Sequence, residues 1–288
     1  MAYRFAVFLC CLFGLLSQLA WAQGSAASEG LNETFHTVKL SRGSELNILV
    51  SKKKDAAPTV AILLFAGYPG ILRIRYEAGN IGYDLAGNFL VRARRHLNNG
   101  TTYTVMVDCP VDQWTSCDDR YRSSEQHAED VAEVINTLRG DFGAQQVYIV
   151  GTSYGTVSSS FLAKNLGDKI DGAIHTATFT DPRSGKGAHG APMRSFDWSK
   201  AKAPQLFVHH KDDPCDVTRY SSVLERKGEL PLITVEGSRN PRGDACQALT
   251  AHGFVGREKA VMFAMSDWII SRKVAALLTR PHNKRHML

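Results

Sequence analysis

The sequence has little of what metal-binding, membrane-spanning or nucleic-acid-binding proteins usually contain. Its 288 residues include only six cysteines, and no two of them have C-x-x-C spacing, so we expect no metal site. After the N-terminal segment, no stretch is long and apolar enough to span a bilayer, which argues against stable membrane insertion. No arginine-rich helix and no basic stripe interleaved with aromatic residues is present, so we expect no nucleic-acid partner.

The formal net charge is +6, and part of it lies in the C-terminal tail Arg280–Leu288. A modest positive charge of this kind is typical of a solvated surface. The chain has no internal repeat and no low-complexity tract, and its length suits one large α/β domain.

The N-terminal residues Met1–Ala22 have the pattern of a secretory signal peptide. Phe5–Leu16 is an apolar run after a positively charged start, and Ala20–Ala22 is a small-x-small cleavage pattern. The run is broken at Ser17, short of the ~18 residues that a membrane anchor needs. We therefore expect cleavage near Ala22 and a single mature domain, 23–288, of a secreted or periplasmic protein.

Four cysteines remain after removal of the signal peptide: Cys109, Cys117, Cys215 and Cys246. In an exported chain they are expected to form disulfides, and free thiols are the alternative. Of the three possible pairings we favour the local one, which joins Cys109 to Cys117 and Cys215 to Cys246. In the chain-entropy model, the two closed loops contribute roughly 2.5 and 3.5 kcal/mol to stability.

The most informative stretch is a G-x-S-x-G sequence, Gly151–Gly155, with Ser153 at its centre. It follows an apolar, β-branched run, Gln145–Val150, and precedes a segment with helical apolar spacing, Val157–Leu166. By chance such a sequence arises about 0.1 times in a chain this long, so the motif is strong evidence only together with the strand and helix that flank it. A strand, a tight turn and a helix are the setting of a nucleophile elbow, in which Ser153 is placed at a helix N-terminus.

Strands and helices alternate along the chain, which predicts an α/β fold with a mostly parallel sheet covered by helices on both faces. The expected strands are Thr34–Leu40, Glu45–Ser51, Thr59–Phe65, Tyr103–Val107, Gln145–Val150, Ile170–Thr176, Gln205–His209 and Leu232–Val235. The other expected helices are Asn88–Leu97, Ser124–Leu138, Val217–Arg226 and a long terminal helix, Arg257–Leu278. The remaining segments are expected loops, including Asp108–Arg122 and a minimal lid at Phe179–Trp198.

A serine nucleophile needs a base to take its proton and a carboxylate to orient that base. Among ten histidines, His252 is the favoured base because it lies between the final strand and the final helix. Asp213, a few residues after the preceding strand, is the favoured acid, with Asp212 and Asp181 as alternatives. All these residues follow expected strands, and parallel sheets carry their sites at the carboxyl ends of strands.

The order Ser153, Asp213, His252 resembles that of the α/β-hydrolase superfamily. The resemblance covers most of the mature chain and rests on four stretches: GTSYG, LLFAGYPG, HHKDDPC and AHGF. It implies an eight-stranded sheet, a Ser-His-Asp triad and an oxyanion hole formed by the backbone amides of Tyr154 and Tyr68. Many members have a histidine where this chain has Ala66, which leaves the second donor open.

The resemblance implies a serine hydrolase that needs no cofactor and acts on a small acyl substrate. A carboxylic-ester hydrolase is the favoured function, a peptidase or amidase is the first alternative, and a non-catalytic binding protein is the second. A Cys215–Cys246 bridge would join the acid loop to the histidine loop. We interpret three arginines near strand ends as solvated surface residues, although they could meet an anionic substrate: Arg73, Arg75 and Arg183.

Overall fold

The computed structural model describes residues 27–185 and 189–279, so the expected signal peptide lies outside the described residues. Their main feature is one twisted sheet of nine strands in the order β1-β2-β6-β3-β7-β8-β9-β10-β11. The strands are β1 Leu31–Lys39, β2 Glu45–Lys53, β3 Val60–Phe65, β6 Thr102–Val107, β7 Gln146–Thr152, β8 Gly172–Thr176, β9 Gln205–His210, β10 Leu232–Val235 and β11 Leu277–Leu278.

The sheet is antiparallel only at its N-terminal edge. β1 pairs with β2 and β2 with β6 in antiparallel register, and every later pairing is parallel. The inner strands β3, β6, β8 and β9 are buried along their whole length, as expected of strands covered on both faces. The mostly parallel sheet is confirmed, but it has nine strands where the resemblance implies eight, because β11 adds a two-residue edge.

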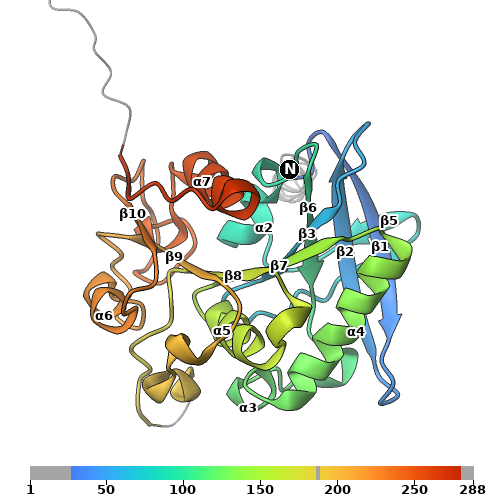
Figure 1. Cartoon of the computed structure of the whole chain (residues 1–288), viewed down its shortest axis with the longest axis horizontal. Coiled ribbons are helices and arrows are strands. Elements are labelled where there is room, and N and C mark those ends of the chain that lie inside the picture. The colour runs from blue at the N-terminus through green and yellow to red at the C-terminus, as the bar shows by residue number, and fades with distance from the viewer. Residues whose placement is uncertain (1–26, 186–188, 280–288) are drawn as a thin grey trace, which may run out of the picture.

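Helices cover both faces, as expected (Figure 1). On one face α2 (Phe89–Ala93) and α7 (Glu258–Ser271) pack with the apolar side chains of β3, β7 and β9. On the other face α4 (Glu125–Asp141) and α5 (Gly155–Asn165) pack against β2, β3, β6 and β7. Two smaller helices complete the structure, α3 (Asp119–Arg122) and α6 (Tyr220–Arg226). Val223 of α6 packs in a further apolar cluster with Phe207 of β9.

Three expectations on secondary structure are wrong. The terminal helix ends at Ser271 and not at Leu278, because Arg272 takes a left-handed conformation with φ +59° and the chain then pairs with β10. The segment Asp108–Arg122 is not all loop, since Asp118 caps α3 with its side chain. A small separate hairpin, β4 (Arg75–Glu77) and β5 (Asn80–Gly82), is also missing from the prediction.

Both disulfides of the favoured pairing are present, Cys109–Cys117 and Cys215–Cys246. The expected lid region contains only short 3-10 turns, Ala191–Ser195 and Trp198–Lys200, in the part that the structure describes. No helix within residues 27–185 and 189–279 has the length and apolar character needed to cross a bilayer.

Candidate active site

Ser153 occupies a sharp turn between β7 and α5 and has a left-handed backbone, with φ +52°. A β-carbon on Gly151 would collide with the carbonyl of Gly155, and one on Gly155 would collide with the carbonyl of Phe65. Both glycines of the G-x-S-x-G sequence are therefore required by close backbone approach. The turn is tied to the sheet by the Ser153 amide, which donates to the carbonyl of Thr176 at 3.0 Å.

The favoured acid and base are in contact. Nδ1 of His252 lies 3.2 and 3.1 Å from the two carboxylate oxygens of Asp213. His252 belongs to a 3-10 turn, Ala251–Gly253, that Thr250 caps by accepting a hydrogen bond from the His252 amide. Ser153 and His252 line the same pocket, although no hydrogen bond joins their side chains among the described residues. In a free enzyme this contact is often long and shortens only when substrate is bound.

Asp213 is held by several donors besides His252. Its Oδ1 accepts from the amide of Cys215 at 2.9 Å, and its Oδ2 accepts from the hydroxyl of Thr218 at 2.9 Å. Nε2 of His209 lies 3.4 Å from Oδ2. Burial opposes ionisation of Asp213, but hydrogen bonds from His209 and His252 outweigh it, and the pKa of the carboxyl falls below its usual value. The group is therefore a carboxylate at neutral pH.

The alternative acids occupy other places. Asp212 is exposed, and its amide donates to Nδ1 of His210. Asp181 accepts hydrogen bonds from the hydroxyls of Thr180 and Ser222. Neither makes a hydrogen bond or ion pair with His252 among the described residues, so the geometry favours Asp213.

His209 has one consistent protonation pattern as a neutral ring. The amide of Thr178 donates to its Nδ1 at 3.3 Å, which makes Nδ1 the acceptor. Nε2 then carries the proton, which it shares between the carbonyl of Thr218 at 2.6 Å and Oδ2 of Asp213 at 3.4 Å. The sequence places this histidine at a strand end, where it could line the site; it is absent from the pocket lining, and no local pattern reveals its contact with the acid.

The expected oxyanion donors lie at the same pocket. The amides of Tyr154 and Tyr68 donate no backbone hydrogen bond to another described residue, and both residues line the pocket with Ser153. A β-carbon on Gly67 would lie 3.2 Å from the β-carbon of Ser153, so the Gly67–Tyr68 turn passes directly beside the serine. The side-chain Oδ1 of Asn88 caps α2, and its Nδ2 group is next to the same turn.

The pocket has a volume of about 890 Å³. Its walls include the rings of Tyr68, Tyr154, Phe179 and His189, and Tyr68 is 62% exposed at its mouth. The other side is formed by the loop before His252, including Arg242, Gly243 and residues 246–249. A pocket of this size suits a small-molecule ligand.

A family model described as serine aminopeptidase, S33, matches residues 118–249, which include Ser153 and Asp213 but end before His252. No curated protein matches the chain by sequence. The solved structures described next show that the chain has the α/β-hydrolase fold.

Three solved structures show this fold at low sequence identity. Est1E from Butyrivibrio proteoclasticus has a TM-score of 0.55 and 14% identity over 82% of this chain and 97% of its own. An α/β serine hydrolase without a lid, from Xanthomonas campestris, has a TM-score of 0.54 and 16% identity, over 84% of this chain and 94% of its own. A putative dipeptidyl aminopeptidase IV from Bacteroides ovatus has a TM-score of 0.57 and 9% identity, over 83% of this chain but only 36% of its own.

One buried cation, Arg122, links the two segments that carry the expected oxyanion donors. The guanidinium of Arg122 donates to the carbonyls of Pro69 and Gly70 at 3.3 and 3.2 Å and to the hydroxyl of Ser158, on α5, at 3.0 Å. It also lies 5.0 Å from the centre of the Tyr154 ring. Arg122 thus joins the Gly67–Gly70 turn to the helix that carries Tyr154. It lies in a polar segment and so resembles a surface arginine in the sequence.

A buried carboxylate, Asp108, holds the chain after that turn. It accepts hydrogen bonds from the amides of Leu72, Ile74 and Cys109, each at 2.8 Å. Burial raises the pKa of Asp108 to about 6, because the loss of hydration outweighs the stabilising amide donors. Asp108 follows β6 directly, so it connects the sheet to the Gly67–Ile74 segment.

The arginines near strand ends have different surroundings. Arg73 and Arg75 form ion pairs with Asp84 and do not line the pocket. Arg183 lines the pocket and forms an ion pair with Asp216 at 2.7 Å.

Trp114 does not line this pocket: it packs beside the Cys109–Cys117 disulfide, and its indole N–H donates to the carbonyl of Cys109.

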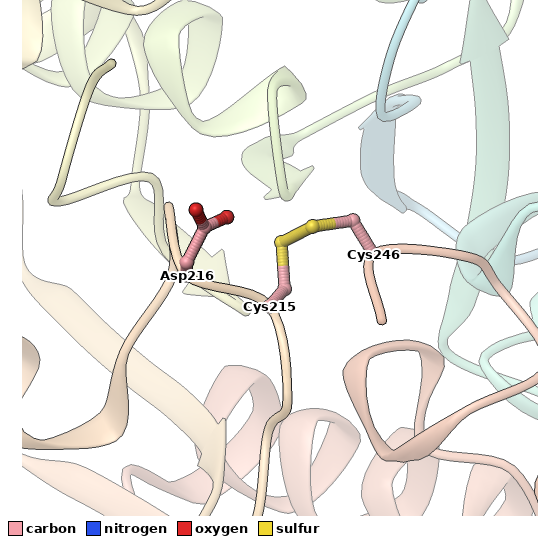
Figure 2. A group of neighbouring side chains, drawn as sticks. All are labelled: Cys215, Asp216 and Cys246. Carbon is pink, nitrogen blue, oxygen red and sulfur yellow. A yellow bond between two sulfur atoms is a disulfide. The ribbon is translucent and has the colours of Figure 1, made fainter. Parts of the chain in front are cut away.

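Cys215, Asp216 and Cys246 lie close enough to suggest a metal-binding group (Figure 2). The two sulfur atoms are bonded to each other, so neither is available as a thiolate ligand. The carboxylate of Asp216 accepts hydrogen bonds from Arg183. We therefore assign these residues to a disulfide and a neighbouring ion pair.

Proposed function

We propose that this protein is a serine hydrolase that cleaves small carboxylic esters through an acyl-enzyme on Ser153. The observation that carries the proposal is the Asp213–His252 contact, located in the pocket that also holds a serine on a strained elbow. A buried carboxylate that faces a histidine next to an activated serine is the arrangement of a catalytic triad.

In the proposed reaction His252 takes the proton of Ser153 while the serine oxygen attacks the acyl carbonyl. The amides of Tyr154 and Tyr68 stabilise the negative charge on the carbonyl oxygen, helped by the N-terminus of α5. His252 then gives its proton to the leaving alcohol. A water molecule, deprotonated by His252, attacks the acyl-enzyme and releases the acid, and the proton returns to Ser153.

Asp213 orients the ring of His252 and stabilises its positive charge during both steps. Because the pKa of Asp213 lies below its usual value, its carboxylate is available throughout the neutral range. The Cys215–Cys246 bridge ties the loop of Asp213 to the loop of His252, which supports a fixed distance between them.

A peptidase is the second candidate, because the matching family model is described as a serine aminopeptidase. An aminopeptidase must bind the cationic amino terminus of its substrate, and a carboxylate usually does this. No aspartate or glutamate lines the pocket among the described residues. This favours an ester over a peptide with a free amino terminus.

The first test is labelling with a fluorophosphonate probe, which reacts only with an activated serine. We expect the unchanged protein to be labelled and Ser153→Ala to give no signal. Ser116→Ala removes an exposed serine outside the pocket and serves as the control. Absence of labelling in folded, oxidised protein would contradict the proposal and favour a non-catalytic binding protein on this fold.

The second test compares acyl esters with aminoacyl anilides as substrates. We expect a higher kcat/KM for esters, and a preference for the anilides would favour the peptidase. We also propose export to an oxidising compartment, which the two disulfides support. Terminal sequencing of protein from its native compartment tests this, with Gln23 as the expected first residue.

A further inference from the structure

The charge of the proposed active-site pocket is one-sided. Its lining includes two arginines, Arg183 and Arg242, and two histidines, His189 and His252. Among the described residues no carboxylate lines it. A cleft lined by charge of one sign attracts ligands of the opposite sign and discriminates against ligands of its own sign.

The two arginines differ in their partners. The guanidinium of Arg183 donates three hydrogen bonds to the carboxylate of Asp216, two from Nη2 and one from Nε. Its charge is therefore offset by a neighbouring carboxylate. The side chain of Arg242 makes no hydrogen bond or ion pair with another described residue. Arg242 therefore supplies the pocket with a guanidinium whose charge no carboxylate offsets.

The backbone of Arg242 is held in place. Its amide donates to the carbonyl of Leu249 at 2.9 Å, which closes the loop between them. Inside this loop Cys246 is bonded to Cys215, and the amide of Gln247 donates to the carbonyl of Asp244. His252 follows the loop by three residues. The start of the Arg242 side chain is thus fixed relative to the proposed base, while its guanidinium is exposed to ligand.

From these observations we infer that the substrate is an ester that carries a carboxylate, and that Arg242 binds this carboxylate. The inference rests on the proposed function and names its substrate class. A guanidinium presents paired N–H donors that match the two oxygens of a carboxylate. Binding there would place the ester group of a short dicarboxylic half-ester, or of an ester with an acidic alcohol, toward Ser153.

The test compares matched esters that differ only in charge. For the acyl side, mono-para-nitrophenyl adipate is compared with para-nitrophenyl hexanoate, after subtraction of spontaneous hydrolysis. For the alcohol side, para-acetoxybenzoate is compared with its methyl ester. We expect kcat/KM to favour the anionic ester about two- to fivefold in one of the two pairs, as is usual for a partly exposed ion pair.

Variants assign the preference to one side chain. We expect Arg242→Gln to abolish it by lowering kcat/KM for the anionic ester and leaving that for the neutral ester unchanged. Arg239→Gln is the matched control, because Arg239 is exposed three residues before Arg242 but does not line the pocket. Raising the salt concentration from about 50 to about 500 mM should shrink the preference in the unchanged protein, since screening weakens exposed charge pairs.

The outcomes separate this inference from the proposed function. Equal rates for charged and neutral esters in both pairs, with normal fluorophosphonate labelling, would overturn the inference and leave the hydrolase function standing. A preference that persists in Arg242→Gln would also overturn it. No ester cleavage and no labelling would contradict the proposed function, and the inference would fall with it.

Discussion

The Nε2 atom of His209 lies 3.4 Å from Oδ2 of Asp213, so a second histidine contacts the carboxylate that faces His252. The ring of His209 is fixed at both nitrogens, by the amide of Thr178 and the carbonyl of Thr218. Because both groups are buried, the contact is shielded from water and stronger than a surface pair. His209 is therefore a positioning residue for the proposed acid.

We expect His209→Phe to lower kcat about tenfold, because it removes a donor to a buried carboxylate, a loss of about 1.4 kcal/mol. His209→Gln should restore most of the activity, since its amide nitrogen can take the place of Nε2. Steady-state kinetics on a neutral ester measure both variants. An unchanged kcat in His209→Phe would show that the second histidine does not position Asp213.

The same variant has a signature in the pH dependence of stability. The pKa of Asp213 is lower in the folded protein than in the unfolded chain, so its ionised form stabilises the fold above about pH 4, and this is lost as the pH falls. Loss of His209 raises the folded-state pKa. The destabilisation of His209→Phe should therefore be largest at neutral pH and shrink below about pH 4. Urea unfolding at several pH values measures it.

Arg122→Lys should lower kcat about ten- to a hundredfold with little change in KM. Lysine keeps the charge but cannot reach Pro69, Gly70 and Ser158 together, so the proposed oxyanion amides lose their alignment. The rate of fluorophosphonate labelling should fall in parallel, because the same amides stabilise that reaction.

Arg120→Lys is the control for Arg122, because Arg120 is an exposed neighbour on the same short helix. A merely structural role for Arg122 would lower the melting temperature while kcat of the folded fraction stayed unchanged. That pattern would refute positioning of the oxyanion hole by this side chain.

The double variant Cys215→Ser/Cys246→Ser tests the bridge between the two catalytic loops. Removing a crosslink of this loop length should lower the free energy of unfolding by about 3.5 kcal/mol in the chain-entropy model. Activity should fall as well, because His252 loses its tie to the loop of Asp213. Cys215→Ala/Cys246→Ala controls for the burial of hydroxyl groups. Unchanged activity together with unchanged stability would disprove this role.

Local patterns predicted the eight longer strands of the sheet well, because each has its own apolar or alternating run. Leu232–Val235 is a strand with the expected bounds, and the favoured cysteine pairs both occur. The end of α7 was missed because it depends on a left-handed Arg272 and on pairing with β10, which no local pattern shows.

The core of the candidate site was also accessible from sequence, since Ser153, Asp213 and His252 each follow a strand. The residues that support them were not. Asp108 contacts the amides of Leu72 and Ile74, which lie 36 and 34 positions earlier in the chain. Such side chains resemble ordinary surface charges until the fold brings their distant partners together.

Asp108 leads to a prediction about pH and stability. Its pKa is about 6 in the folded protein and near 4 in an unfolded chain, so the folded state holds the proton more tightly. Its contribution to stability is thus complete below about pH 4 and is lost as the pH rises through about 6, a change of about 3 kcal/mol. Asp108→Asn cannot titrate and lacks this change.

The free energy of unfolding of the unchanged protein, minus that of Asp108→Asn, should therefore fall by about 3 kcal/mol between pH 4 and pH 7. Taking the difference cancels the other titrating groups, including Asp213. Asp112→Asn is the control, because Asp112 is paired with Arg42 and its pKa lies below its usual value, which gives the opposite trend. A difference that stays constant across this range would mean that Asp108 is already ionised at pH 4. Its three amide donors would then outweigh the loss of hydration, and the Gly67–Ile74 segment would be held by a full charge at every pH tested.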